Sequence, residues 1–195
     1  MGCAQAVKLR LIRWSFVPSL LSEMALAAVL PQRRWWDKVD DRLYLGALPF
    51  AHHAERLHHL GVRAAVNTCL EYRGPVAAYA RLGIEQLRIP VADYHAPSLH
   101  DVQQAVAFIA RHRAAGGAVY VHCKAGRGRS ATIVLCWLVK QRGMSPEEAQ
   151  QWLAKRRPHV DRFLYRRPVV QEFWRQIADD VPQQDPMVLA TARGD

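Results

Sequence analysis

The segment 118–130, AVYVHCKAGRGRS, constrains the fold of this chain more than any other part of the sequence. Its first residues, Ala118 to Val121, are apolar and β-prone, and the residues after it are apolar and helix-compatible as far as Val139. The order strand, tight loop, helix gathers loop N–H groups and the positive end of a helix around one point. Because such a concave ring of amides binds tetrahedral oxyanions, the segment predicts an anion site at the carboxyl end of a strand.

The side chains of this segment indicate what the anion site could do. A thiol is a poor nucleophile until it ionises, with an ordinary pKa of about 8.5, and a helix N-terminus, loop amides and a guanidinium all favour the thiolate. Cys123 is therefore the expected nucleophile, and Arg129 offers a planar fork for two oxygens of one phosphate. We expect Ser130 to support the thiolate and His122 to orient the loop. The expected substrate-binding residues are Lys124, Ala125, Gly126, Arg127, Gly128 and Arg129.

Cleavage of a phosphate ester also needs a proton donor for the leaving oxygen. Asp93 is the candidate general acid and base, because it lies in a loop directly after a predicted strand, 84–89. An aspartate in a loop is also commonly a turn residue, which is the alternative for Asp93. Asp101 is a rival acid, but it follows Ser98 at the spacing of a capping box, so we assign it to helix capping.

The pattern His-Cys, five residues, Arg-Ser resembles the signature of the cysteine-dependent phosphatases, in their dual-specificity branch. This resemblance implies a phosphocysteine intermediate and no metal or organic cofactor. Other stretches resemble, more narrowly, the mitochondrial family that dephosphorylates phosphatidylglycerophosphate; they are Trp36–Val39, Leu43–Pro49, Gly83–Leu87, Asp93–Tyr94, Val119–Ser130 and Ser145–Ala149. The resemblance covers most of residues 9–178. It departs at a loop that is rich in glutamate in that family, where this chain has Glu71-Tyr72 followed by Arg73-Gly74-Pro75.

Strand-like and helix-like segments alternate along the chain, which predicts an α/β fold: a central, mostly parallel sheet with helices on both faces. The resemblance implies the dual-specificity phosphatase fold. The predicted strands are 43–46, 62–67, 84–89 and 118–122, and the predicted helices are 51–60, 76–82, 98–115, 130–142, 145–157 and 168–179. We expect an N-terminal apolar and basic segment over 1–34, a catalytic domain over 35–181 and a tail over 182–195.

The net charge of +10 implies anionic partners. Aromatic and basic residues do not alternate and no nucleic-acid module is recognisable, so we expect no nucleic acid. The basic residues gather in two groups, each either a solvated face or a contact for lipid headgroups: Lys8, Arg10, Arg13, Arg33 and Arg34, then Lys155, Arg156, Arg157, Arg162, Arg166 and Arg167. The four cysteines show neither paired nor metal-ligand spacing, which favours a reducing compartment; Cys136 is expected in the core.

The segment 1–34 has no acidic residue before Glu23, and apolar residues recur in it at helical spacing. It fits an interfacial anchor, a mitochondrial address or a helix packed on the domain. Pro18 and Glu23 interrupt its apolar stretch, so a membrane span is not expected. The predicted location is membrane-associated, at the mitochondrial inner membrane in a eukaryote and otherwise cytoplasmic.

Three functions remain open on this basis. The first is a phosphatase that converts phosphatidylglycerophosphate to phosphatidylglycerol, on the way to cardiolipin, with an anionic phospholipid and a membrane surface as partners. The second is a protein phosphatase for phosphotyrosine and phosphoserine or phosphothreonine, with a phosphoprotein as partner. The third is a phosphate-binding module without turnover, and the presence of Cys123, Arg129 and Asp93 argues against it. A sulfurtransferase also uses a cysteine in an anion cradle, but it needs no acid loop.

Overall fold

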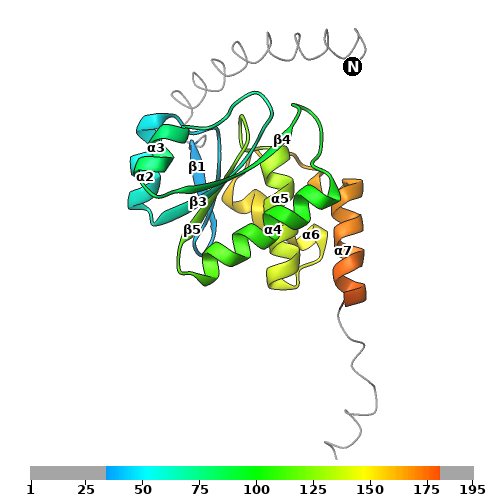
Figure 1. Ribbon diagram of the computed structural model, residues 1–195. Helices are drawn as coiled ribbons and strands as arrows, with labels where there is room; N and C mark the ends of the chain where they lie inside the picture. The colour runs from blue at the N-terminus through cyan, green and yellow to red at the C-terminus, as the bar shows by residue number, and fades with distance from the viewer. Residues whose placement is uncertain (1–33, 181–195) are drawn as a thin grey trace, which may run out of the picture.

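The computed structural model of the chain describes residues 34–180. The predictions for the N-terminal segment, apart from its last residue, and for the tail therefore lie outside the described residues. Within this range five strands form one sheet in the order β1-β2-β5-β3-β4 (Figure 1). They are β1 (Trp36–Asp40), β2 (Leu43–Gly46), β3 (Val62–Cys69), β4 (Glu85–Val91) and β5 (Ala118–His122). Only the pair β1 and β2 is antiparallel, so the prediction of a mostly parallel sheet is confirmed.

Helices cover both faces of the sheet, as predicted (Figure 1). On one side lie α2 (Ala51–His59) and α3 (Val76–Arg81), which pack with Val62, Ala65 and Tyr120 in the smaller apolar cluster. On the other side lie α4 (Leu99–Ala114), α5 (Arg129–Arg142), α6 (Pro146–Arg156) and α7 (Pro168–Asp180), with the short 3₁₀ helix η1 (Leu164–Arg166) before α7. The larger core lies between these helices and the sheet.

The ends of the long helices follow from local sequence. The Ser98 hydroxyl accepts a hydrogen bond from the backbone N–H of Asp101, and the Asp101 carboxylate accepts one in return from the backbone N–H of Ser98. This reciprocal capping box confirms the assignment of Asp101 to helix capping. The same box forms at Ser145 with Glu148, and α5 ends at Gly143, which has a left-handed backbone.

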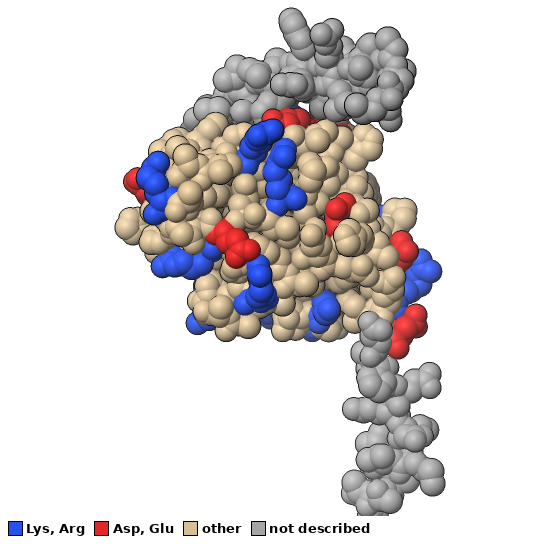
Figure 2. All heavy atoms as spheres, viewed as in Figure 1, with Lys and Arg blue, Asp and Glu red and all other residues tan. Residues whose placement is uncertain are grey.

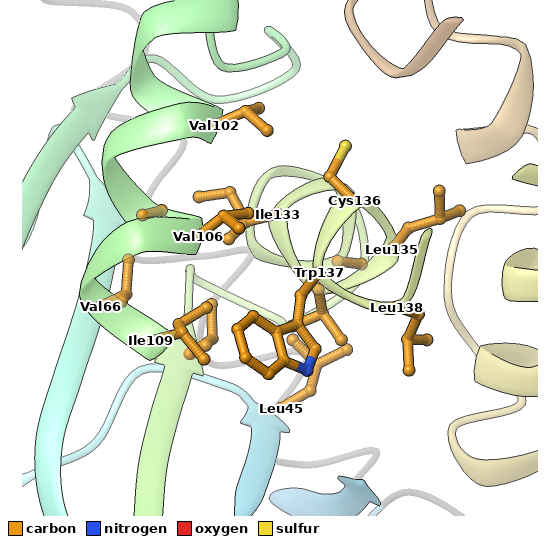
Figure 3. Close-up of a cluster of buried hydrophobic side chains, with 14 of the residues drawn as sticks. Leu45, Val66, Val102, Val106, Ile109, Ile133, Leu135, Cys136, Trp137 and Leu138 are labelled. Carbon is orange, nitrogen blue, oxygen red and sulfur yellow. The ribbon is translucent and has the colours of Figure 1, made fainter. Parts of the chain in front are cut away.

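Helix α5 is the centre of the larger core, because every residue from Arg129 to Val139 is buried. Figure 3 shows Trp137 of α5 beside Ile109 of α4 and Leu45 of β2. Cys136 is fully buried in the larger core, as expected. Since β5 is also buried at every position, the loop between β5 and α5 is held at both ends by buried elements.

Strand β1 was not predicted. Its sequence, WDKVD, carries two aspartates, and aspartate is depleted in strands. Both carboxylates are buried, and both are paired with arginines: Asp37 with Arg157, and Asp40 with Arg113 and Arg142. The arginines that neutralise these buried carboxylates come from distant parts of the chain. The sequence of β1 alone therefore does not predict a strand.

Candidate active site

The loop between β5 and α5 surrounds the sulfur of Cys123. The backbone N–H of Gly126 and the hydroxyl of Ser130 both donate to Cys123 Sγ at 3.2 Å. Burial alone raises the pKa of this thiol, but the charge of Arg129 and hydrogen bonds from Ser130 and from the backbone of Arg127 outweigh burial and lower the pKa to about 7. A substantial fraction of the sulfur is therefore thiolate at neutral pH, as a nucleophile requires.

Gly126 is required by the way this loop lies on the sheet. Its φ is +68°, in the left-handed region, and a side chain at this position would collide with the backbone of Gly46 at the end of β2. The backbone N–H of Leu48 donates to the carbonyl of Lys124 at 3.1 Å. The loop thus rests directly on the chain that leaves β2, which fixes its height above the sheet.

Arg129 is buried, with 3% of its surface exposed, and is held by the loop after β3 and by the end of β4. Its Nη1 donates to Glu71 Oε2 at 3.0 Å and to the carbonyl of Val91 at 2.8 Å. Its Nη2 makes no hydrogen bond with the described residues, although Asp93 Oδ1 lies 2.9 Å away as an ion pair. Nη1 is therefore the anchored end of the guanidinium, and Nη2 is the end that can donate to a phosphate oxygen.

Asp93 lies at the same place as Cys123 and Arg129, as the sequence predicted. Lys124 Nζ donates to Asp93 Oδ2 at 2.7 Å, and Arg129 holds the other carboxylate oxygen. The Asp93 side chain therefore lies on the wall of the cavity that Cys123 and Arg129 also line. An incoming phosphate dianion and this carboxylate would compete for the same two cations.

His122 does not have the properties of a proton donor. Its ring is fully buried and stacks on Tyr120, with 5.5 Å between the ring centroids. Burial lowers the pKa of this imidazole to about 3, with Arg129 acting in the same direction, so the ring is neutral at pH 7. Its carbonyl accepts a hydrogen bond from the Thr68 hydroxyl at 2.9 Å. These contacts are compatible with a role in orienting the loop.

The cavity above Cys123 has a volume of about 380 Å³, larger than one phosphate group needs. It is lined by the catalytic loop, by residues 93–95 and by His159, Asp161 and Arg167. Among the described residues no group of three or more His, Cys, Asp or Glu is placed to hold a metal ion. Nor does any helix within residues 34–180 combine the length and apolar character needed to cross a bilayer.

Arg157 was not recognised as a site residue. The sequence placed it in a basic group that is either solvated or in contact with lipid headgroups, and for Arg157 this was wrong, because only 1% of its surface is exposed. Its guanidinium donates to the carbonyls of Ala125 at 3.0 Å and Gly126 at 2.9 Å, and pairs with Asp37 at 2.7 Å. Since these carbonyls turn toward Arg157, their peptide planes are fixed, and with them the directions of the adjoining loop amides.

Glu71 is the second site residue whose role the sequence left open. It was noticed only because the loop around it departs from the expected pattern. Its carboxylate fixes Arg129, and the neighbouring Tyr72 hydroxyl donates to the carbonyl of Pro49 at 2.6 Å, tying this loop to the chain after β2. The spacing between Glu71 and Arg129 gave no signal, because the contact joins the loop after β3 to the start of α5.

Comparisons with known proteins agree with this geometry. The sequence profile of the dual specificity phosphatase catalytic domain matches residues 43–178. The phosphatidylglycerophosphate phosphatase PTPMT2 of Arabidopsis thaliana is 40% identical over 163 residues, which is 82% of this chain and 72% of that protein. The human phosphatidylglycerophosphatase and protein-tyrosine phosphatase 1 is 32% identical over 199 residues, covering 97% of this chain and 99% of that protein.

A similar solved structure is the crystal structure of PTPMT1 in complex with PI(5)P. It superposes with a TM-score of 0.68 at 33% identity and covers 75% of this chain and 98% of that one. The fold and the loop around a low-pKa thiol define a cysteine-dependent phosphatase. The chain belongs to the dual-specificity phosphatase family and is therefore a phosphoric monoester hydrolase.

Proposed function

We propose that this phosphatase removes the terminal phosphate of phosphatidylglycerophosphate and releases phosphatidylglycerol, the precursor of cardiolipin. The observation that carries this proposal is a cysteine with a pKa of about 7 in an oxyanion-binding loop, in a chain that is 40% identical to a protein named for this activity. In a eukaryote the enzyme would work at the mitochondrial inner membrane, where its lipid substrate and a membrane surface would be its partners.

The proposed reaction has two steps. The amides of residues 124–129 and Arg129 Nη2 hold the phosphate, and the Cys123 thiolate attacks phosphorus in line to form a phosphocysteine. Asp93 protonates the oxygen of the departing alcohol, so the first step leaves a hydroxyl group on the product and an aspartate carboxylate. In the second step this carboxylate takes a proton from the attacking water, and the P–S bond breaks. The Ser130 hydroxyl, 3.2 Å from the sulfur, stabilises the returning thiolate.

Lys124 and Arg127 lie on the same cavity as the nucleophile, and both suit an anionic substrate. A second function, a protein phosphatase for phosphotyrosine and phosphoserine or phosphothreonine, is supported by the name of the human relative, which includes protein-tyrosine phosphatase activity. The human dual specificity phosphatase 28 is also 37% identical over 123 residues. The two functions use the same chemistry and differ in what surrounds the phosphate.

Phosphate release by the full chain distinguishes the two functions. The substrates are phosphatidylglycerophosphate in vesicles that contain phosphatidylglycerol, and a panel of phosphotyrosine and phosphothreonine peptides. We expect kcat/KM on the lipid to exceed that on every peptide by about 10² or more, a difference of about 2.7 kcal/mol in transition-state binding. Equal or reversed preference would favour the protein phosphatase. The Cys123→Ser variant should bind the lipid without turnover, and turnover by this variant would exclude Cys123 as the nucleophile.

A further inference from the structure

Two exposed aromatic side chains flank the active-site cavity. Tyr94 lines the cavity, directly follows Asp93 and has 92% of its surface exposed. Phe163 is 57% exposed, and its backbone N–H donates at 2.9 Å to Asp161, which lines the same cavity. No other large apolar side chain among the described residues is more exposed than these two. A single exposed aromatic residue needs no explanation, but two beside one cavity, one lining it and the other hydrogen-bonded to a residue that lines it, indicate a contact surface.

The backbone, rather than packing, presents both rings to the outside. Tyr94 has a φ of +63°, a conformation that costs a residue other than glycine about 1 kcal/mol or more. It follows Asp93, whose carboxylate is held inward by Lys124 and Arg129. With Asp93 turned into the site, the next side chain projects outward. Phe163 lies in the turn that Asp161 closes, just before η1.

Exposed arginines accompany Phe163. Arg162 and Arg166 are both exposed, and the guanidinium of Arg166 lies 5.3 Å from the ring centroid of Phe163. On the face shown in Figure 2, lysine and arginine side chains are scattered, and acidic side chains lie beside several of them. Aromatic rings with arginines beside them suit the boundary between lipid tails and anionic headgroups, where each basic residue contributes about 1 kcal/mol.

The site itself needs such a surface if its substrate is a lipid. Cys123 is at the floor of a cavity and only 4% exposed, so a headgroup has to leave the plane of the bilayer to reach it. The distance is shortest when the cavity mouth lies on the membrane. We propose that Tyr94, Arg162, Phe163 and Arg166 form a docking rim that seats the active site on an anionic phospholipid bilayer. The lipid substrate in this argument rests on the proposed function, whereas docking can be measured without turnover.

The test uses the full chain and a rim variant that combines Arg162→Gln, Phe163→Ser and Arg166→Gln. Tyr94 stays unchanged because it borders Asp93. The matched control, Leu60→Ser with Arg63→Gln and Arg81→Gln, likewise replaces one exposed apolar side chain and two exposed arginines, at the opposite end of the strands, near the starts of β3 and β4. The measurements are sedimentation with vesicles of phosphatidylcholine plus phosphatidylglycerol, sedimentation with phosphatidylcholine alone, and turnover of p-nitrophenyl phosphate.

We expect the rim variant to bind the mixed vesicles at least about tenfold more weakly than the control variant, since two basic residues and a ring are lost. Turnover of the soluble substrate should stay within about twofold, which shows that the fold and the site are intact. Equal vesicle binding by the two variants would overturn the docking rim. So would a rim variant that keeps vesicle binding and loses activity on phosphopeptides, because the surface would then bind peptides.

The outcomes also distinguish this proposal from the proposed function. If phosphatidylglycerophosphate is not hydrolysed but vesicle binding still depends on the rim, docking stands and the assignment of the lipid substrate fails. If the lipid is hydrolysed equally well by both variants and both bind vesicles alike, the substrate assignment stands and the docking rim fails.

Discussion

Replacement of Arg157 by methionine should weaken both the fold and the catalytic loop. The guanidinium is almost fully buried, pairs with Asp37 at 2.7 Å and donates to the carbonyls of Ala125 and Gly126. Removal of one partner of a buried pair costs about 3–5 kcal/mol. Asp37 keeps a second partner, because Arg34 Nε lies 2.9 Å from its other oxygen. We therefore expect a loss of about 3 kcal/mol, at the lower end of that range, in urea-induced unfolding.

The effect on catalysis follows from the two loop carbonyls. Without Arg157 their peptide planes are free to rotate, and the amides that hold phosphate and thiolate lose alignment. One donor in an oxyanion site is worth about 10²–10³ in rate, so kcat on p-nitrophenyl phosphate should fall by at least about tenfold. The pKa of Cys123 should also rise above its value of about 7. The pH dependence of thiol alkylation by iodoacetamide measures this shift directly.

Two further variants test whether Arg157 holds the catalytic loop. Arg157→Lys keeps the charge beside Asp37 but cannot donate to two carbonyls as a planar fork, so it should restore stability more than kcat. Arg156→Met is the control, because the Arg156 guanidinium lies 3.5 Å from the centroid of the Trp152 ring and donates to the Trp152 carbonyl in its own helix. It should cost about 1 kcal/mol and leave kcat unchanged. If Arg157→Met behaves like Arg156→Met in both assays, Arg157 does not hold the loop.

Four more outcomes are expected. Below pH 7, kcat/KM on p-nitrophenyl phosphate should fall about tenfold per pH unit, because Cys123, with its pKa of about 7, becomes protonated and loses its nucleophilic form. A flat profile between pH 5 and 7 would contradict a thiolate nucleophile. Glu71→Gln should raise the inhibition constant for inorganic phosphate about tenfold, since Arg129 loses the charge that fixes Nη1, and unchanged inhibition would leave Glu71 without this role. Asp93→Ala should reduce kcat on alkyl phosphates by about 10²–10⁴ and on p-nitrophenyl phosphate much less; equal losses on both would remove it as the acid. Trp137→Ala should destabilise the protein by about 3–5 kcal/mol in urea, and a loss under 1 kcal/mol would mean that the core closes over the gap.

The catalytic loop could be predicted from the sequence because its residues are neighbours in the chain. The order of Cys123, the two glycines, Arg129 and Ser130 already specifies their geometry once the flanking strand and helix are recognised. Helix ends were predictable for the same reason, since capping boxes act over three residues. Asp93 could be predicted as a site residue because loops after parallel strands converge at one edge of the sheet.

The supports of the loop could not be predicted in this way. Glu71 and Arg129 are 58 positions apart, and Asp37 and Arg157 are 120 apart. A run of basic residues in the sequence does not show which of them is buried in the fold, so Arg157 was grouped with its exposed neighbours. Strand β1 was missed for the related reason that its aspartates are neutralised by partners far away in the chain.

The antiparallel edge of the sheet has a practical consequence for anyone who shortens this chain. The family match begins at Leu43, within the described catalytic unit but after β1. A fragment cut at that boundary would discard Asp37 and the Val39 carbonyl to which the Trp152 indole donates at 3.1 Å. It would retain Cys123, Arg129 and Asp93 but lose the Asp37 carboxylate that pairs with the buried guanidinium of Arg157. The smallest useful expression fragment therefore starts ahead of Trp36, although the chemistry lies almost ninety residues further on.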